Sequence, residues 1–451
     1  MTNQELLAKY DVPGPRYTSY PTVPYWTQAP TADEWRSHLE RAIERGLGHD
    51  EGASLYVHVP FCKSLCHYCG CNTFVTRDKA VSGPYVDSLL AEWALYTSRL
   101  GRVRLDEVHL GGGTPTFLSA DELDRLLSGV FDTAVVPPYA ERSIEVDPRT
   151  TTRDQLEVLA RLGFQRISLG IQDFDPVVQA AVNRHQTLDE VRRVTDDARA
   201  LGFKSVNYDL IYGLPKQTPS SVAGTIETVR ALGPDRIAFY GYAHVPWMKS
   251  VQRKFEDADV PSGLDKRRLY ELGRDALEAA GYREIGLDHF ALEKDGLWLA
   301  VKEGRMHRNF MGYTERRAMP IIGLGVSSIG DSWTAYAQNA KTVPEYAQKV
   351  ALGEWPIIRG HVLDEEDQVL RRHILSVMTR FETDWSGDAL AYLALVRPKL
   401  VEMARDGLVT LSEAGVKVTP LGQPFVRNVC MALDARLARQ APDRPLFSRT
   451  V

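Results

Sequence analysis

The sequence predicts an α/β protein: a partial (β/α)6 barrel with an extended N-terminal arm and a small, mostly helical, winged-helix-like C-terminal domain. Between residues 54 and 245, six short apolar runs alternate with helical patterns, a series typical of parallel strands joined by right-handed crossovers. Each run is followed at once by a polar segment containing Gly or Pro, which places all six segments on one rim of the sheet. A closed eight-stranded barrel needs two more strands, so the expected sheet is open and continues into a less regular stretch over 265–345.

The elements of the barrel follow from the period of the apolar residues. Strands are expected at Ser54–Val59, Glu107–Leu110, Ser143–Val146, Arg166–Leu169, Ser205–Leu210 and Arg236–Tyr240. Helices are expected at Val86–Leu100, Ala120–Val130, Arg153–Leu162, Thr187–Leu201 and Ser220–Leu232.

Three parts of the chain are distinguished by composition. Residues 1–35 are rich in Pro, Tyr and Thr and are interpreted as an extended arm rather than a packed element, and residues 36–355 as the catalytic domain. Residues 361–451 form the small C-terminal domain, with strands expected near Leu408–Thr410 and Val416–Thr419. This domain carries twelve acidic and twelve basic residues, so the basic footprint of a nucleic-acid-binding domain is missing and a packing or lid role is expected.

The composition of the 451-residue chain limits its location and partners. A net charge of −5 does not indicate a polyanionic partner. The N-terminus lacks an apolar signal region and no apolar run is long enough to span a membrane, so a cytoplasmic location is expected. Nothing indicates an oligomer, and a monomer is the expectation.

The cysteines form the most specific pattern in the sequence. Of five cysteines, four lie within ten residues, in the order Cys62, Cys66, Cys69 and Cys71, directly after the first predicted strand. Three thiolates on one loop are typical of a [4Fe–4S] cluster whose fourth iron stays open to a small molecule. The alternative is a structural zinc site on all four, although zinc usually binds two paired spacings on separate knuckles. Cys430, alone in a predicted helix, is expected to be a buried structural thiol.

Several rim residues are suited to ligand binding. Glycines at 111–113 allow close approach of the backbone, Glu145 and Asp209 can accept hydrogen bonds from ammonium or hydroxyl groups, and Arg184 can pair with a carboxylate. Two others are expected to be structural: Asp147 as a helix N-cap and His58 as a satisfied core histidine.

Taken together, these motifs resemble those of the oxygen-independent coproporphyrinogen III oxidases, which are radical S-adenosylmethionine (SAM) enzymes. The resemblance covers nearly the whole chain. It includes GPRYTSYPT at 14–22, YVHVPFCKSLCHYCGCN at 56–72, HLGGGTPTFL at 109–118, IEVDPR at 144–149, LGIQDF at 169–174, VNRHQ at 182–186, NYDLIYGLPKQT at 207–218, YAHVP at 242–246, HRNFMGYT at 307–314 and GLGVSSIGD at 323–331. The arm and Cys71 favour this branch over its haem-chaperone relatives.

The resemblance implies a partial radical SAM barrel with a [4Fe–4S] cluster on Cys62, Cys66 and Cys69 and two bound SAM molecules. The implied contacts to the SAM on the cluster are Tyr56, Tyr68, Gly112, Glu145 and Ile329. The implied contacts to the second SAM are Gly113, Thr114, Gln172, Arg184, Asp209 and Ala243. Cys71, Tyr56 and Glu145 are the implied catalytic residues.

The implied reaction converts two propionate side chains of coproporphyrinogen III into vinyl groups, with loss of carbon dioxide, to give protoporphyrinogen IX in haem biosynthesis. A reductase or a flavodoxin- or ferredoxin-type protein would donate the electron. Candidate cations for the substrate carboxylates are Arg16, Arg149, Arg308, Arg316 and Arg317. Alternatives are another radical SAM reaction on the same scaffold, methyl transfer or cyclopropanation, and haem binding by a chaperone.

Two departures from the family pattern concern the substrate. Met311 stands where some members carry Gln, and Glu315-Arg316-Arg317 replaces a small polar pair after GYT. Both segments are expected to border the substrate cavity.

Overall fold

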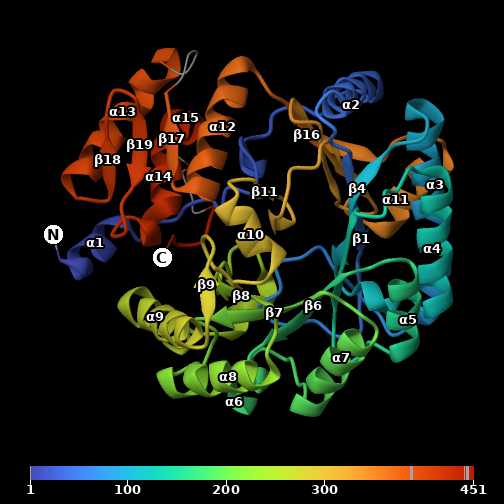
Figure 1. The fold of residues 1–451 in the computed structure, drawn as a ribbon, viewed down its shortest axis with the longest axis horizontal. Helices are drawn as coiled ribbons and strands as arrows, with labels where there is room; N and C mark the ends of the chain where they lie inside the picture. The colour runs from blue at the N-terminus through green and yellow to red at the C-terminus, as the bar shows by residue number, and fades with distance from the viewer. Residues whose placement is uncertain (1, 386–389, 441, 443–445, 451) are drawn as a thin grey trace.

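The computed structural model describes residues 2–385, 390–440, 442 and 446–450. At its centre lies one open twelve-stranded sheet, ordered β16-β15-β14-β13-β1-β4-β5-β6-β7-β8-β10-β9 (Figure 1). All six predicted strands are present and pair in parallel in chain order. They are β1 (Ala53–Val59), β4 (Leu105–Gly112), β5 (Glu141–Val146), β6 (Arg166–Gln172), β7 (Ser205–Tyr212) and β8 (Arg236–Gly241).

Helices cover the outer side of these strands, as the alternation predicts (Figure 1). The five predicted helices are α3 (Ser82–Leu100), α4 (Ala120–Thr133), α5 (Arg153–Arg161), α7 (Leu188–Ala200) and α8 (Pro219–Leu232), and a short α6 (Pro176–Ala181) is added. Capping boxes at Ser119, Thr152 and Thr187 start three of them, because each hydroxyl accepts from the backbone three residues on. Their apolar faces and the strands share one large core.

The stretch after β8 is more regular than expected, and this is a correction to the predicted irregular region over 265–345. The strand β13 (Ile321–Leu324) pairs in parallel with β1. Antiparallel strands extend both edges of the sheet: β14 (Ile329–Asp331), β15 (Ala335–Asn339) and β16 (Ile357–Val362) on one, β10 (His289–Leu292) and β9 (Tyr282–Glu284) on the other. Three helices, α9 (Gly263–Ala279), α10 (Gly296–Lys302) and α11 (Val343–Ala351), and the hairpin β11 (His307–Asn309) and β12 (Gly312–Thr314) complete the region.

The N-terminal arm is not purely extended, which is a second correction. It begins with α1 (Asn3–Tyr10), started by a capping box between Thr2 and Glu5, and α2 (Ala32–Leu47) begins before residue 36. Leu6, Tyr17 and Tyr20 are buried in the core of the C-terminal domain. The arm therefore packs as part of that domain, and both marked chain ends lie beside α1 (Figure 1).

The C-terminal domain alternates helices with a three-stranded antiparallel sheet, ordered β17-β19-β18. Its elements are α12 (Glu365–Arg380), β17 (Glu382–Asp384), α13 (Leu390–Arg405), β18 (Val409–Leu411), β19 (Gly415–Val418), α14 (Val426–Leu433) and α15 (Ala435–Arg439). Within the predicted domain 361–451, residues 386–389, 441, 443–445 and 451 lie outside the described residues. Cys430 is buried in α14, as predicted for a structural thiol.

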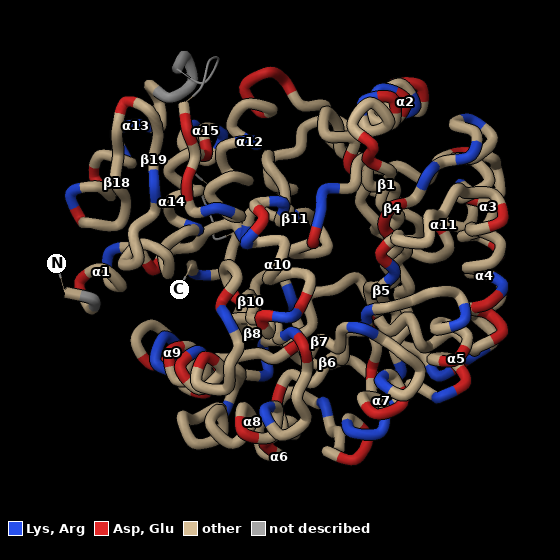
Figure 2. The backbone as a smooth tube through the Cα atoms, in the orientation of Figure 1, with Lys and Arg blue, Asp and Glu red and all other residues tan. Residues whose placement is uncertain are grey.

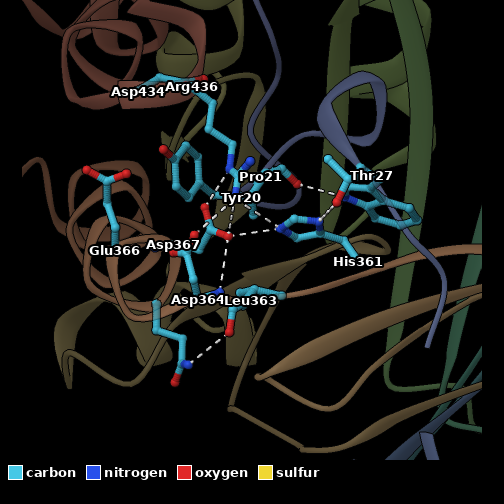
Figure 3. Close-up of polar contacts among 12 residues, drawn as sticks. Tyr20, Pro21, Thr27, His361, Leu363, Asp364, Glu366, Asp367, Asp434 and Arg436 are labelled. Carbon is cyan, nitrogen blue, oxygen red and sulfur yellow. Dashed lines mark hydrogen bonds and ion pairs between the residues drawn. The ribbon is translucent and has the colours of Figure 1, made fainter. Parts of the chain in front are cut away.

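Polar contacts fasten this domain to the rest of the chain (Figure 3). The Asp367 carboxylate accepts hydrogen bonds from Arg436 at 2.7 Å and from Nε2 of His361 at 2.9 Å. Nδ1 of His361 in turn lies 3.3 Å from the hydroxyl of Thr27 in the arm. Arm, sheet edge and C-terminal domain therefore meet at one buried ion pair.

The exterior carries both charge signs side by side along the outer helices (Figure 2). Among the described residues, no helix is both long and apolar enough to cross a membrane.

Replacement of Glu92 should change how stability depends on pH. This fully buried carboxylate of α3 accepts from Asn339, Tyr346 and the backbone of Gly325, yet burial raises its pKa to about 7. The folded state therefore retains the proton that the unfolded chain loses near pH 4.5, so stability falls as the pH rises from about 5 to 8. Over that range the unfolding free energy of Glu92→Gln should gain about 3 kcal/mol relative to the wild type. Denaturation of both proteins at several pH values checks this, and parallel curves would contradict it.

Candidate active site

The four clustered cysteines lie on the loop that leaves β1 at the carboxyl rim of the sheet. Two short parallel strands, β2 (Phe61–Cys62) and β3 (Phe74–Val75), close this loop at its base. Cys66 is buried, Cys62 and Cys69 are half-buried and Cys71 is exposed, and all five cysteines of the chain are free thiols. The rim location is the one predicted from the strand order.

The electrostatic setting of the thiols favours ligation of iron. The hydrogen bond from Cys71 lowers the pKa of Cys69 to about 6, and the nearby cations Lys249 and Arg184 act in the same direction. Burial raises the pKa of Cys62 to about 11, so ligation of a metal at this residue must displace the thiol proton. No three His, Cys, Asp or Glu side chains in the described ranges converge as a single bound ion requires.

A cavity of about 260 Å³ extends from the cysteines across the ends of β4 to β7. Of the predicted cofactor contacts, its lining includes Tyr68, Gly112, Gly113, Thr114, Glu145, Gln172, Arg184 and Asp209. Gly112 has a φ of +112°, and a Cβ there would lie 2.7 Å from the His58 ring; one on Gly113 would lie 2.6 Å from the Pro60 carbonyl. Both positions therefore require glycine, because the end of β4 lies directly against the end of β1 and the start of the cysteine loop.

Glu145 is held ionised in the wall of this cavity. Burial disfavours the ionised form of Glu145. However, Nε2 of His109 at 3.3 Å and the backbone N–H of Gly112 at 3.2 Å donate hydrogen bonds to the carboxylate, and the net effect is a lowered pKa. Asp209 shows the opposite: burial and the charge of Glu145 raise its pKa to about 7, although Ser168 and Asn207 donate to it. Of these two carboxyl groups, Glu145 is therefore ionised, whereas Asp209 binds a proton much more readily.

Arg184 links the cysteine loop to the strand ends. One of its terminal nitrogens lies 3.7 Å from the Cys66 sulfur and 3.6 Å from Asp147, while the other donates to the Gly170 carbonyl. Asp147 also pairs with Arg149 at 2.6 Å. The expectation that Asp147 caps a helix is wrong, because Thr152 caps α5 and two arginines occupy the carboxylate.

A second cavity, of about 530 Å³, adjoins the first and shares Cys71, Gly112, Glu145 and Tyr240 with it. Its lining adds the predicted residues Tyr56, Ile329, Arg16, Arg308 and Met311. Arg308 is buried, and its Nε and Nη1 find no partner among the described residues. The second cavity is therefore lined by a positively charged guanidinium with unused hydrogen-bond donors, an arrangement suited to binding a carboxylate.

His58 between the cavities is a satisfied histidine, as predicted. Its Nε2 lies 2.9 Å from the Asn72 carbonyl and must donate, so Nδ1 accepts from the Tyr56 hydroxyl at 3.0 Å. Burial lowers the pKa of the ring and keeps it neutral. His58 fixes the Tyr56 phenol and has no free nitrogen to act as a base.

Some predicted residues lie elsewhere. Ala243 lines neither cavity, and its carbonyl accepts from Gln252 at 3.2 Å. Arg316 and Arg317 are exposed, near Tyr139 and Trp333, and Glu315 pairs with Arg236 at the start of β8. The expectation that residues 315–317 border the substrate cavity is therefore wrong, because they lie toward the opposite end of the strands, whereas Met311 does border it.

Sequence reasoning missed a set of polar side chains that support the cavities. His109 and Tyr240 line the second cavity, where His289 lies 3.5 Å from the Tyr240 hydroxyl. Asp288 accepts from His289 at 2.8 Å and pairs with Arg16 at 3.2 Å. His109 and Tyr240 lie on predicted strands close to the rim, and that position was the available signal.

The parallel sheet, the three-cysteine loop at its carboxyl rim and the glycine-floored cavity beside it define a radical SAM enzyme. The family model of the radical SAM superfamily matches residues 56–229, which include the cysteine loop and the parallel strands from β1 to β7.

Full-length relatives narrow the assignment. The chain is 39% identical over 457 aligned positions to the oxygen-independent coproporphyrinogen III oxidase of Pseudomonas aeruginosa, covering 99% of this chain and 98% of the relative. It is 40% identical to that of Escherichia coli K12, with the same shares covered. The solved coproporphyrinogen III oxidase of Escherichia coli, described as a radical SAM enzyme, superimposes with a TM-score of 0.88 at 38% identity, over 94% of this chain and 98% of that one. The chain belongs to the oxygen-independent coproporphyrinogen III oxidase family.

Proposed function

We propose that this protein catalyses oxidative decarboxylation of two propionate side chains of coproporphyrinogen III to vinyl groups, giving protoporphyrinogen IX for haem. The observation that carries the proposal is the junction of the two cavities. One is lined by the cysteine loop, the other by the unsatisfied guanidinium of Arg308, and they share Cys71 and Glu145. A carboxylate held by Arg308 would bring its side chain to this junction.

The residues assigned to the cofactors are those already lining the first cavity. Cys62, Cys66 and Cys69 would hold the [4Fe–4S] cluster. With SAM on its open iron, the cluster supplies the one-electron chemistry that activates an unreactive C–H bond. Ionised Glu145 and the backbone at Gly112, both in the lining, would receive the ammonium and ribose groups of SAM.

A second SAM is part of the proposal. Arg184, Asp209 and Gln172 line the same cavity. Arg184 can pair with a carboxylate, and Asp209 with a hydroxyl or an ammonium. Equilibrium dialysis with labelled SAM should give two molecules per chain, and Asp209→Ala should leave one.

The remaining cationic candidates are divided by position. Arg16 and Arg308 line the second cavity and are assigned to substrate carboxylates, while Arg149 lines the first. Cys71 and Tyr56 lie where a substrate side chain would meet SAM and are assigned to the reaction itself.

The alternative functions are less favoured. These are methyl transfer, cyclopropanation and haem binding by a chaperone, whereas the relatives that match over the full length are oxidases.

The test is an anaerobic assay with reconstituted cluster, reductant, SAM and coproporphyrinogen III. Mass spectrometry should find a product lighter by two carbon dioxide units and four hydrogens in total, together with 5′-deoxyadenosine. Formation of 5′-deoxyadenosine with intact porphyrinogen would retain the cofactor assignment and refute the substrate.

An acidic electron carrier of the flavodoxin or ferredoxin type is the proposed donor. The face around the cysteine loop carries exposed cations, among them Arg77, Arg253 and Lys254, beside exposed apolar Phe74 and Met248. The 245–255 segment packs against the loop, since Lys249 donates to the Cys71 carbonyl and Lys254 lies 3.3 Å from His67. Basic and apolar groups over the nearest approach to the cluster complement an acidic redox protein.

Charge reversal on this face should slow only protein-mediated reduction. Arg77→Glu is expected to lower the rate with reduced flavodoxin about tenfold, because steering by opposite charge is lost. The rate with dithionite should stay unchanged, as should both rates in Lys204→Glu, an exposed control at the opposite end of the sheet. Equal rates of the two variants with flavodoxin would refute this donor surface.

We further propose that a single chain forms the active unit. Residues 36–355 would form the catalytic domain, and the arm and 361–451 would close it from one side. One chain lines both cavities, so we take the monomer to be active, with the cytoplasm as its location. Size-exclusion chromatography with an activity assay of each fraction tests the monomer.

A further inference from the structure

A third cavity lies away from the cysteine loop, where α9, the arm and the C-terminal domain meet. It measures about 90 Å³ and has two carboxylates in its lining, those of Glu284 and Asp288. Six cationic side chains line it: Arg16, Lys266, Arg267, Arg274, Arg427 and Arg449. Positive charge therefore exceeds negative charge in the lining by four.

Four of the cations have carboxylate partners inside the protein. The pairs are Arg16 with Asp288 at 3.2 Å, Arg267 with Glu271 at 2.8 Å, Arg274 with Asp275 at 2.8 Å and Arg449 with Asp11 at 3.4 Å. Arg427 and Lys266 have no such pair among the described residues, and Glu284 is the one lining carboxylate that none of the six cations pairs with, so one positive charge remains in excess.

Arg427 is a fixed positive charge in the wall. It is buried in α14, and its guanidinium donates hydrogen bonds only to backbone carbonyls. Two of these carbonyls belong to Gly14 and Pro15 in the arm, and two belong to Arg449 and Thr450 near the C-terminus. Carbonyls satisfy its N–H groups without cancelling its charge. Three segments therefore hold this guanidinium in place.

Lys266 is the unpartnered member. It is half-buried in the first turns of α9, and in the described part of the chain its ammonium has no hydrogen bond or ion pair, only the Tyr212 ring at 5.8 Å. Burial, Arg16 and Arg427 lower its pKa to about 8, as expected for a cation crowded by like charge. An ammonium that lines a cavity and has no acceptor in the protein is free to pair with an anionic ligand.

The geometry points to a binding site for a small multivalent oxyanion, held by Lys266 in front of Arg427 and Arg449. The volume equals that of about three waters in the liquid, enough for a phosphate-sized ion. Arg449, with 62% of its side chain exposed, places the cavity within reach of solvent. The bound ion would join the arm, α9 and the C-terminal domain.

Two sources could supply such an oxyanion: free phosphate, or a substrate propionate. Arg16 lines both this cavity and the substrate cavity, but it occupies the boundary by pairing with Asp288 and donating to the Gly241 carbonyl at 2.7 Å. We therefore assign the third cavity to free phosphate, bound separately from the substrate.

Thermal unfolding of the anaerobic holoenzyme tests the site, with sodium phosphate against sodium chloride at equal ionic strength. Phosphate should raise the transition temperature saturably by a few degrees, because it binds only the folded state. In Lys266→Gln the rise should disappear, and calorimetric affinity should drop at least tenfold. Without phosphate, this variant should unfold at the same or a higher temperature, since an uncompensated charge has been removed.

Arg268→Gln, an exposed position on the same helix, is the control and should keep the full phosphate effect. Equal shifts by phosphate and chloride, or an undiminished shift in Lys266→Gln, would overturn the inference. The effect should also persist with coproporphyrin III bound. If the porphyrin alone produces the shift and blocks that of phosphate, the cavity belongs to the substrate site and a separate anion site is refuted.

Discussion

Cys66→Ala is expected to abolish both the cluster and the reaction. Cys66 is the buried member of the loop, and Arg184 approaches its sulfur to 3.7 Å. Only two of the three assigned ligands, Cys62 and Cys69, would remain, which is too few to hold a [4Fe–4S] cluster. The broad visible absorbance of the reconstituted protein should be lost, and 5′-deoxyadenosine should fall below detection.

Two matched substitutions separate ligation from other effects of losing a thiol. Cys430→Ala, buried in the C-terminal domain, should keep cluster and activity and lose only about 1–2 kcal/mol of stability from the small cavity created. Cys71→Ala should keep the cluster and lose product, because Cys71 lines both cavities. Loss of iron from Cys71→Ala, with iron retained in Cys66→Ala, would contradict the ligand assignment.

Arg308→Leu is expected to raise the KM for coproporphyrinogen III roughly 100-fold, while the cluster absorbance stays unchanged. Arg308 lines the second cavity, its buried Nε and Nη1 have no partner among the described residues, and its guanidinium lies 4.4 Å from the centre of the Tyr313 ring. Removing one member of a buried charged pair costs about 3 kcal/mol, which corresponds to that factor. Steady-state kinetics at saturating SAM measure it.

The control for Arg308 is Arg316→Gln, an exposed arginine toward the opposite end of the strands. It should leave KM unchanged. A normal KM in Arg308→Leu, or an equal increase in both variants, would refute the assignment of Arg308 to a substrate carboxylate.

Periodicity was sufficient for the central part of the fold. The runs that became β1 and β4 to β8 are short, contain buried apolar residues, and alternate with amphipathic helical patterns, which predicts parallel strands without tertiary information. In contrast, β13 to β16 are short, and their pairing depends on neighbours far along the chain, as in Ser54 opposite Ile321. The helix α1 was missed because the Pro-rich composition of the arm outweighed the capping box at Thr2.

The candidate site was predictable where strand ends alone decide position. The cysteine loop, Glu145 and Asp209 lie on the rim by topology. Partners were not predictable: Asp147 pairs with Arg149 and Arg184 instead of capping a helix, and the tautomer of His58 depends on the Asn72 carbonyl. The placement of Glu315 depends on Arg236, distant in sequence.

The most direct test of the central claim follows the hydrogen atom. Coproporphyrinogen III carrying deuterium at the β-carbons of its propionates is incubated anaerobically with the reduced holoenzyme and SAM. We expect deuterium in 5′-deoxyadenosine and a divinyl product formed with loss of two carbon dioxide molecules. Vinyl formation without deuterium transfer, or a methylated product that keeps all four carboxylates, would contradict it.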